Sequence, residues 1–182
     1  MSHKIILDTD PGIDDAMAIF FAFQSPDIDV LGLTTVYCNV PVEMAAQNAL
    51  TLCEMAGVDI PVCKGVGMPW VGPQSTYAHF VHGEITVVAI GPLGNLALAL
   101  RLEPELPKLL KGVSIMGGAA FVPGNVTPVA EANIWNDAYA AEIVFAADWN
   151  LTMFGLDVTM TLPFEPAFLE GLRDNNAKLG GF

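Results

Sequence analysis

Four carboxylates lie within eight residues near the start of the chain, at Asp8, Asp10, Asp14 and Asp15. Acids this close repel one another unless protons or a cation neutralise them. Oxygen donors at this density suit Ca²⁺ or Mg²⁺, whereas zinc prefers His and Cys ligands. The alternative is a helix N-cap with solvated acids, for which a single Asp would be enough. The cluster therefore favours a site for a hard divalent cation.

The residues on both sides of this cluster predict a strand-to-helix turn. The apolar run 5–7 is typical of a buried strand, and the run 16–23 is typical of a buried helix. Pro11 and Gly12 suit the tight turn between them. The last two acids would lie at the helix start, where the helix dipole favours negative charge. In an open α/β sheet this turn lies at the carboxyl end of a strand, where such folds bind ligands.

The stretch Asp8–Ala16 resembles the N-terminal signature of the inosine/uridine-preferring nucleoside hydrolases. The resemblance implies a Rossmann-like nucleoside hydrolase fold with a Ca²⁺ site. It implies that Asp10 and Asp15 bind the cation, and that Asp10 also acts as general base on a bound water. It further implies that Asp14 holds a ribose hydroxyl during catalysis.

A second signature, Gly124–Asp137, resembles the stretch with which the same family binds ribose. Amides and a carboxylate suit a sugar, because they can donate to and accept from its hydroxyls. Glu131 and Asn133 are two residues apart, so we expect them to point to one side of an extended segment. The resemblance implies that Asn125, Glu131 and Asn133 bind the ribose. The alternative is a polar loop with Asn turns.

Four positions elsewhere in the chain carry the same resemblance. Asn39 follows the apolar run 30–36 and matches an Asn that contacts the ribose region. His82 matches a His beside the family's active site, as a ligand contact or an acid. The resemblance assigns the main-chain carbonyl of Ile90 to the calcium shell and Met116 to a ribose or base contact. The structural alternatives are a turn Asn, a structural His, an ordinary Gly-Pro turn and a core Met.

Apolar runs alternate with helical stretches along the whole chain, which predicts a single α/β domain over residues 1–182. The apolar runs are continuous, as in parallel strands covered on both faces, so we expect a mostly parallel sheet flanked by helices. The expected strands are 5–7, 30–36, 60–63, 85–90, 113–116 and 151–156. The expected helices are 16–23, 41–55 before Gly57, 96–100, one restarting at 103–106, 138–145 capped by Asp137, and 165–172.

The resemblance is interrupted near residues 83–85. In the family, an acidic, glycine-rich flap and a helix follow the His-Gly pair, whereas here Gly83 and Glu84 run directly into the next apolar run. No residue after Leu172 matches the family's C-terminal His-Asp pair. We therefore expect an incomplete nucleoside hydrolase fold with an internal gap. A deletion in the protein and an incomplete chain are both compatible with this pattern.

The composition restricts the partners of the chain. A net charge of −13 with only 7 Lys and Arg argues against binding to nucleic acid or an anionic membrane. A hydrophobic fraction of 53% with 15% charged residues argues against disorder. Three Cys without metal-site spacing indicate reduced thiols in a cytoplasmic protein. No apolar run has the length of a membrane span, and the start lacks the apolar region of a signal peptide.

These patterns predict calcium-dependent hydrolysis of the N-glycosidic bond of purine or pyrimidine ribonucleosides to ribose and free base. The family resemblance also implies a homo-oligomer. One alternative is a catalytically inactive fragment that binds the metal or the nucleoside. A metal-dependent phosphatase of the Asp-x-Asp type is a weaker alternative. It needs a cation near the acids, but Lys4 lies at the wrong end of its strand and the first Arg is Arg101.

Overall fold

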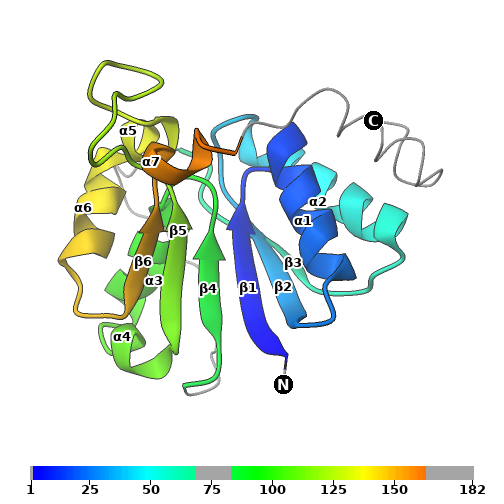
Figure 1. Cartoon of the computed structure of the whole chain (residues 1–182). Helices are drawn as coiled ribbons and strands as arrows, with labels where there is room; N and C mark the ends of the chain where they lie inside the picture. Colours follow the sequence, from blue (N-terminus) through cyan, green and yellow to red (C-terminus); the bar gives the residue numbers. More distant parts are fainter. Residues whose placement is uncertain (1, 69–82, 163–182) are drawn as a thin grey trace.

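Most of the described strands are followed by one or two helices, which agrees with the α/β pattern of the sequence. The computed structural model describes residues 2–68 and 83–162. The strands are β1 (His3–Thr9), β2 (Ile28–Thr35), β3 (Val62–Lys64), β4 (Thr86–Ala89), β5 (Gly112–Met116) and β6 (Leu151–Phe154). All five neighbouring pairs are parallel, and the strand order is β3-β2-β1-β4-β5-β6 (Figure 1). This is the doubly wound, Rossmann-like order that the family resemblance implies.

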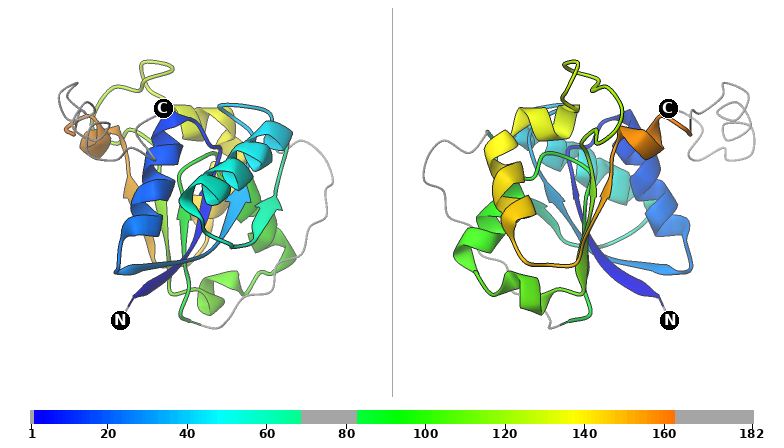
Figure 2. Two further views of the ribbon diagram at one scale, coloured as in Figure 1. Left: turned by 90° about the vertical axis from the view of Figure 1, so that its right-hand side faces the viewer. Right: turned by 60° about the vertical axis from the view of Figure 1, so that its left-hand side comes forward.

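Helices flank both faces of this sheet (Figure 2). They are α1 (Ile13–Gln24), α2 (Val42–Ala56), α3 (Gly94–Leu102), α4 (Leu106–Leu109), α5 (Ala132–Asn136), α6 (Ala138–Ala146) and α7 (Leu156–Thr159). Val88 of β4 packs against the apolar cluster that contains Ile19 of α1, whereas Val87 belongs to the cluster that contains Leu96 of α3. Successive strand side chains point to opposite faces, so the helices of the two clusters cover opposite faces.

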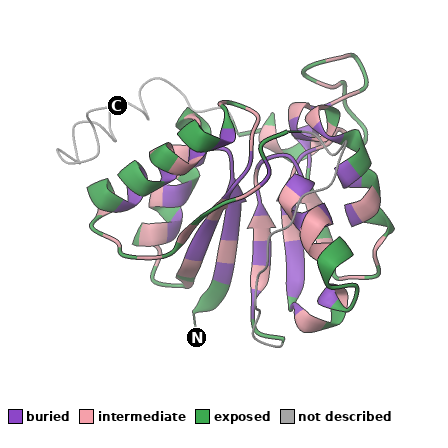
Figure 3. Ribbon diagram, turned by 180° about the vertical axis from the view of Figure 1, so that it is seen from behind, coloured by how far each residue is buried: buried purple, intermediate pink, exposed green. Residues whose placement is uncertain are grey.

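The burial pattern follows from this arrangement. The central strands are mostly buried, and the outer sides of the helices are exposed (Figure 3). Within the described residues, no helix is both long enough and apolar enough to cross a membrane. The stabilising core therefore lies in two apolar layers, one on each face of the sheet.

Most predicted helix ends are confirmed. Gly57 ends α2 with φ +68°, in the left-handed region that glycine adopts easily. Asp137 caps α6 by accepting a hydrogen bond from the backbone N–H of Ala140 at 3.1 Å. Pro41, expected at the first helical position, is instead the N-cap of α2. The expected helix 165–172 lies outside the described residues.

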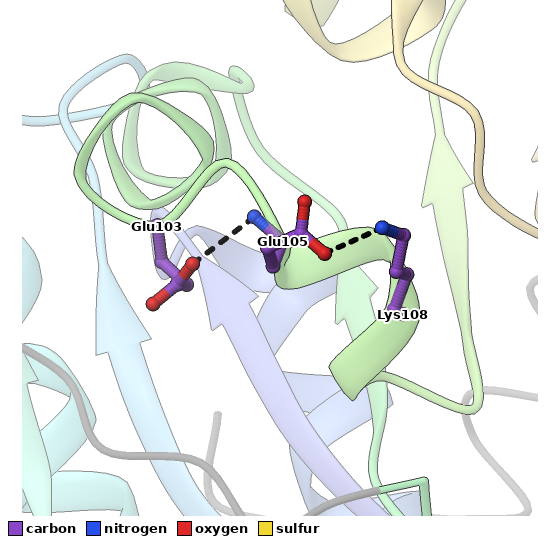
Figure 4. Close-up of polar contacts among 3 residues, drawn as sticks. All are labelled: Glu103, Glu105 and Lys108. Atoms are coloured by element: carbon purple, nitrogen blue, oxygen red, sulfur yellow. Dashed lines mark hydrogen bonds and ion pairs between the residues drawn. The ribbon is translucent and has the colours of Figure 1, made fainter.

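The short helix α4 restarts just after α3, close to the predicted position (Figure 4). Glu103 Oε1 accepts a hydrogen bond from the backbone N–H of Glu105 at 3.0 Å, and the Glu105 carboxylate pairs with Lys108. Exposed ion pairs contribute at most about 1 kcal/mol. The fully buried side chain of Leu106 therefore anchors α4 more firmly than its surface charges do.

A buried polar network joins the carboxyl ends of the first two strands. Asp8 Oδ1 accepts hydrogen bonds from Thr34 Oγ1 at 2.5 Å and Asn95 Nδ2 at 2.7 Å. The same Asn95 amide donates to the Thr35 carbonyl at 2.9 Å and accepts from the Val66 N–H at 2.7 Å. Burial raises the pKa of Asp8 to about 6, and its two hydrogen bonds oppose this effect. The first acid of the motif is thus part of the scaffold.

Candidate active site

The candidate site lies at two turns, one after β1 and one after β4, where the strand order reverses. Strands β1 and β4 are neighbours, and Asp10 follows β1 while Ile90 and Gly91 follow β4. A Cβ added at Gly91 would lie 2.5 Å from Asp10 Oδ1, so only glycine fits at this contact. The candidate site therefore lies at the topological switch point, where doubly wound sheets bind ligands.

Asp10 and Asp15 are both buried and are linked through Asn39. The Asn39 N–H donates to Asp10 Oδ2 at 3.0 Å, and its side-chain amide donates to Asp15 Oδ2 at 3.3 Å. Asp15 also accepts from Thr9 Oγ1 at 2.7 Å and from the backbone N–H of Gly12 at 3.1 Å. The latter bond caps the start of α1. Three of the predicted site residues are therefore in one hydrogen-bonded group.

The electrostatics of this group differ from those of solvated acids. Burial raises the pKa of Asp10 to about 7, the Asn39 N–H lowers it, and the charge of Asp15 raises it further. Burial also raises the pKa of Asp15, to which the charge of Asp14 adds. Asp14 itself is exposed on the first turn of α1. Near neutral pH, a bound proton or a bound cation would therefore stabilise the buried carboxylates of Asp10 and Asp15.

Glu131, predicted to bind ribose, is the N-cap of α5. Its Oε1 accepts from the Asn133 N–H at 3.0 Å, and its Oε2 accepts from the N–H groups of Ile134 at 3.2 Å and Gly118 at 2.9 Å. The expectation that residues 131–133 are extended was wrong, because a helix begins at Ala132. Capping rather than strand-like alternation explains the spacing of Glu131 and Asn133.

The Asn133 side chain joins two other predicted residues. Its Nδ2 donates to the carbonyls of Ile90 at 2.9 Å and Met116 at 3.0 Å, and lies 3.4 Å from Met116 Sδ. The structure therefore places Asn133, Ile90 and Met116 together across the ends of β4 and β5. A carbonyl oxygen has two lone pairs, so the Ile90 carbonyl can bind a cation while it accepts the hydrogen bond from Asn133. Asn125 is exposed, and its Oδ1 accepts from the Ala132 N–H at 3.0 Å.

Cys38 and Asn136 were not predicted as site residues, although Cys38 directly precedes Asn39 and Asn136 lies within the second signature. The Asn39 N–H donates to Asp10 Oδ2 at 3.0 Å, and Asn136 Nδ2 donates to Cys38 Sγ at 3.2 Å. Burial raises the pKa of Cys38 to about 12, and the charges of Asp10, Glu131 and Asp15 act in the same direction. The thiol therefore stays protonated at neutral pH. The one signal in the sequence was its position directly before Asn39.

The donor set for a cation is small in the part of the chain described. No group of three or more His, Cys, Asp or Glu side chains in residues 2–68 and 83–162 could hold a metal ion. A cation would therefore need main-chain, water or substrate oxygens in addition to the Asp10 and Asp15 carboxylates. His82, predicted as a ligand contact or an acid, lies outside the described residues.

Comparisons with known proteins agree with the resemblance seen in the sequence. The family model of the inosine-uridine preferring nucleoside hydrolases matches residues 5–85 and 83–182. The chain belongs to this family. It is 41% identical to uridine nucleosidase 1 of Arabidopsis thaliana over 195 residues, which cover 88% of this chain and 58% of the relative. It is 38% identical to the inosine-uridine preferring nucleoside hydrolase of Leishmania major over 219 residues, which cover 100% of this chain and 69% of the relative.

Solved structures of nucleoside hydrolases confirm the predicted fold. A plant nucleoside hydrolase superposes with a TM-score of 0.90 at 38% identity, covering 99% of this chain and 68% of the other. An inosine-guanosine nucleoside hydrolase gives a TM-score of 0.88 at 28% identity, covering 99% and 70%. This family member thus spans between 58% and 69% of the length of the two relatives named above.

Proposed function

We propose that the chain provides the ribose-binding and water-activating part of a nucleoside hydrolase. The reaction is hydrolysis of the N-glycosidic bond of ribonucleosides, such as inosine and uridine, to ribose and free base. One observation carries the proposal: two turns and the second signature come together at the switch point of the sheet. Asp10 and Asp15, linked through Asn39, lie beside Gly91, and Asn133 of the second signature donates to the carbonyl of the preceding Ile90. The names of relatives that act on uridine and inosine support the same reaction.

The residues present fit Ca²⁺. Asp10 and Asp15 are buried acids with raised pKa values, and Ile90 directly precedes Gly91, which lies against Asp10. The two carboxylates and the Ile90 carbonyl would form a hard donor set of the kind that Ca²⁺ prefers. A cation would also relieve the repulsion between the two buried carboxylates. When bound, Ca²⁺ would bind the ribose hydroxyls and lower the pKa of a bound water.

The side chains of the chain itself supply the remaining functions. Asp10 accepts a proton from the attacking water as general base. Asp14, exposed at the start of α1, accepts a hydrogen bond from a ribose hydroxyl. The transition state resembles an oxocarbenium ion, which nearby carboxylates stabilise. The ribose is oriented by Asn39, Met116, Asn125, Glu131 and Asn133.

The test is ribose release from inosine and from uridine by the purified chain, with Ca²⁺ and with chelator. We expect turnover that chelator abolishes and that Asp10→Asn lowers by about 10²–10⁴-fold, the usual contribution of a general base. Asp29→Asn, an exposed acid of β2, is the matched control and should keep wild-type turnover. Turnover that persists in chelator would contradict the calcium assignment.

A second candidate is an inactive fragment that binds Ca²⁺ or nucleoside without turnover. The observation that favours it is length, because the chain covers only 58% of its Arabidopsis relative. Calorimetric Ca²⁺ binding by a folded chain that releases no ribose would select this candidate.

The assembly and location of the protein are part of the same proposal. We expect a homo-oligomer, which sedimentation velocity would test. The three cysteines are free thiols, which agrees with a cytoplasmic location.

A further inference from the structure

The side-chain amide of Asn95, on the first turn of α3, contacts three segments of the chain at once. Its Nδ2 donates to Asp8 Oδ1 at 2.7 Å and to the Thr35 carbonyl at 2.9 Å, and its Oδ1 accepts from the Val66 N–H at 2.7 Å. An Asn side chain has two N–H donors and one carbonyl acceptor, so Asn95 uses both kinds of group. These bonds join the ends of β1 and β2 to the segment after β3.

Two glycines allow α3 to approach the segment after β3 this closely. A Cβ added at Gly65 would lie 2.1 Å from Asn95 Oδ1, and a Cβ added at Gly94 would lie 2.6 Å from Val66 Cγ2. Any larger residue at Gly65 would displace the Asn95 amide from its partners. The backbone on both sides of this contact is therefore fitted to the amide.

The two strand ends that Asn95 holds lead directly into the candidate site. Asp8 lies two residues before Asp10, and Thr35 lies four residues before Asn39. The two segments meet where the Asn39 N–H donates to Asp10 Oδ2 at 3.0 Å. One side chain therefore joins the two backbone segments that carry the proposed base and its hydrogen-bond donor.

Asp8 depends strongly on this amide. The Asp8 side chain is buried, and its Oδ1 accepts from Thr34 Oγ1 as well as from Asn95 Nδ2. Its Oδ2 has no hydrogen-bond partner among the described residues. A buried polar group that loses a partner costs free energy. Without the Asn95 amide, we therefore expect segment 8–10 to shift.

We propose that Asn95 is a positioning residue, whose amide fixes segments 8–10 and 35–39 relative to each other and so keeps the Asn39 N–H on the Asp10 carboxylate. The catalytic consequence of this inference rests on the nucleoside hydrolase function proposed above. Asn95 acts through Asp10 and Asn39 and not on the substrate. Its loss should loosen the bond between these two residues and lower the rate of the chemical step.

The first experiment measures hydrogen exchange of the Asn39 N–H by NMR, in chelator and without denaturant. We expect Asn95→Ala to speed this exchange at least about 10-fold, because the segment that carries the N–H opens more easily. Leu106→Val, which trims a fully buried side chain of α4, is the control for a general loss of stability. It should leave the Asn39 exchange rate unchanged. Equal rates in wild type and Asn95→Ala, or equal acceleration in both variants, would overturn the inference.

A second pair of variants exchanges the polar groups. Asn95→Asp keeps an acceptor for the Val66 N–H but removes both donors and places a second carboxylate against Asp8, so Asn39 exchange should be as fast as in Asn95→Ala. Adding Asp8→Asn restores one donor and one acceptor between the two positions, with their roles reversed. We expect this double variant to recover most of the wild-type protection of the Asn39 N–H. A double variant that exchanges as fast as Asn95→Asp would contradict the proposed contact.

The same variants are then compared for kcat and KM with inosine and uridine at saturating Ca²⁺. We expect Asn95→Ala to lower kcat at least about 10-fold with KM within about 3-fold, since a displaced catalytic group slows the chemical step. The exchanged double variant should recover most of this rate. Gln47→Ala, which removes an exposed amide of α2, should behave as wild type. Wild-type kcat in Asn95→Ala would overturn the positioning role.

The exchange measurement separates this inference from the proposed function. If the unaltered chain releases no ribose, the proposed function fails, and hydrogen exchange alone decides whether Asn95 holds the two segments together. Faster Asn39 exchange in Asn95→Ala but not in Leu106→Val would then support the inference, and any other pattern would refute it.

Discussion

Each of the two signatures of the site buries an acid, but the two acids have different neighbours. Asp10 in the turn after β1 and Glu131 at the start of α5 are each only 2% exposed. Asp10 lies beside Asp15, and burial raises the pKa of both. Glu131 instead accepts three backbone hydrogen bonds from its own helix and from Gly118. The first signature therefore needs a proton or a cation from outside, whereas the chain itself satisfies the second.

The largest effect on stability is expected at Glu131. Glu131→Ala removes an N-cap, at about 1 kcal/mol, and leaves the Gly118 N–H without its acceptor, at about 1–3 kcal/mol. We expect a loss of roughly 3 kcal/mol in urea unfolding, equal with and without Ca²⁺. Glu142→Ala, an exposed residue of α6, is the control and should change stability by less than about 0.5 kcal/mol. A loss seen only with Ca²⁺ would show that Glu131 belongs with the cation site.

Calcium should stabilise the chain through the first signature. A ligand at 100 times its Kd raises the free energy of unfolding by about 2.7 kcal/mol. We expect Asp15→Asn to remove most of this gain, because it takes away one of two buried carboxylates. Asp59→Asn, in an exposed position after α2, should keep the gain. Equal Ca²⁺ responses in both variants would refute the assigned ligands.

In chelator, the stability of the protein should depend on pH through the buried Asp10 of the first signature. The pKa of Asp10 is raised from 3.8 to about 7, so between these values the folded state binds more protons than the unfolded state. The contribution of Asp10 to the free energy of unfolding should therefore be largest below pH 4 and should fall as pH rises towards 7. The fall should be at least about 1.4 kcal/mol, the equivalent of one pKa unit.

The contribution of Asp10 is the difference between the wild-type curve and the Asp10→Asn curve, since Asp8 and Asp15 have raised pKa values too. We expect the variant to show a flatter profile over pH 4–7. A wild-type curve that rises with pH over this range, or two curves of equal slope, would contradict a raised pKa of Asp10.

The smallest effect on stability is expected at Asp14. Asp14→Asn changes an exposed side chain on the first turn of α1, so urea unfolding should shift by less than about 0.5 kcal/mol. Ribose release should nevertheless fall at least about 10-fold, because a charged hydrogen bond to a ribose hydroxyl is weakened. A variant that loses stability but keeps its turnover would assign Asp14 to the scaffold.

Local features of the fold were predictable from the sequence. Gly57 ends α2 and Asp137 caps α6 as predicted, because both depend on backbone geometry within a few residues. The meeting of Asp10, Asp15 and Asn39 was predictable through the family resemblance. The cap at Glu131 was not predictable in this way, since Ser, Thr, Asp and Asn are the preferred N-cap side chains and Glu is not among them.

Other features could not be predicted because they depend on residues distant in the chain. Asp8 belongs to the scaffold only because Asn95, 87 residues away, donates to it. Cys38 is joined to α5 only because Asn136, 98 residues away, donates to its sulfur. No local pattern distinguishes these residues from an ordinary acid and an ordinary core thiol.

The sequence by itself determined the strands and the longer helices, although not α5 and α7, and it showed that carboxylates crowd the turn after the first strand. Periodicity and turn residues act over a few positions, so they can be recognised without knowing the fold. Only the tertiary structure decided which acids lie close to one another and which groups surround each of them. The order of the parallel strands places Gly91 beside Asp10, and the Asn133 side chain of α5 donates to the Ile90 carbonyl. Asp10 and Glu131 are equally buried, so their neighbours, not their burial, make one a candidate base and the other a helix cap.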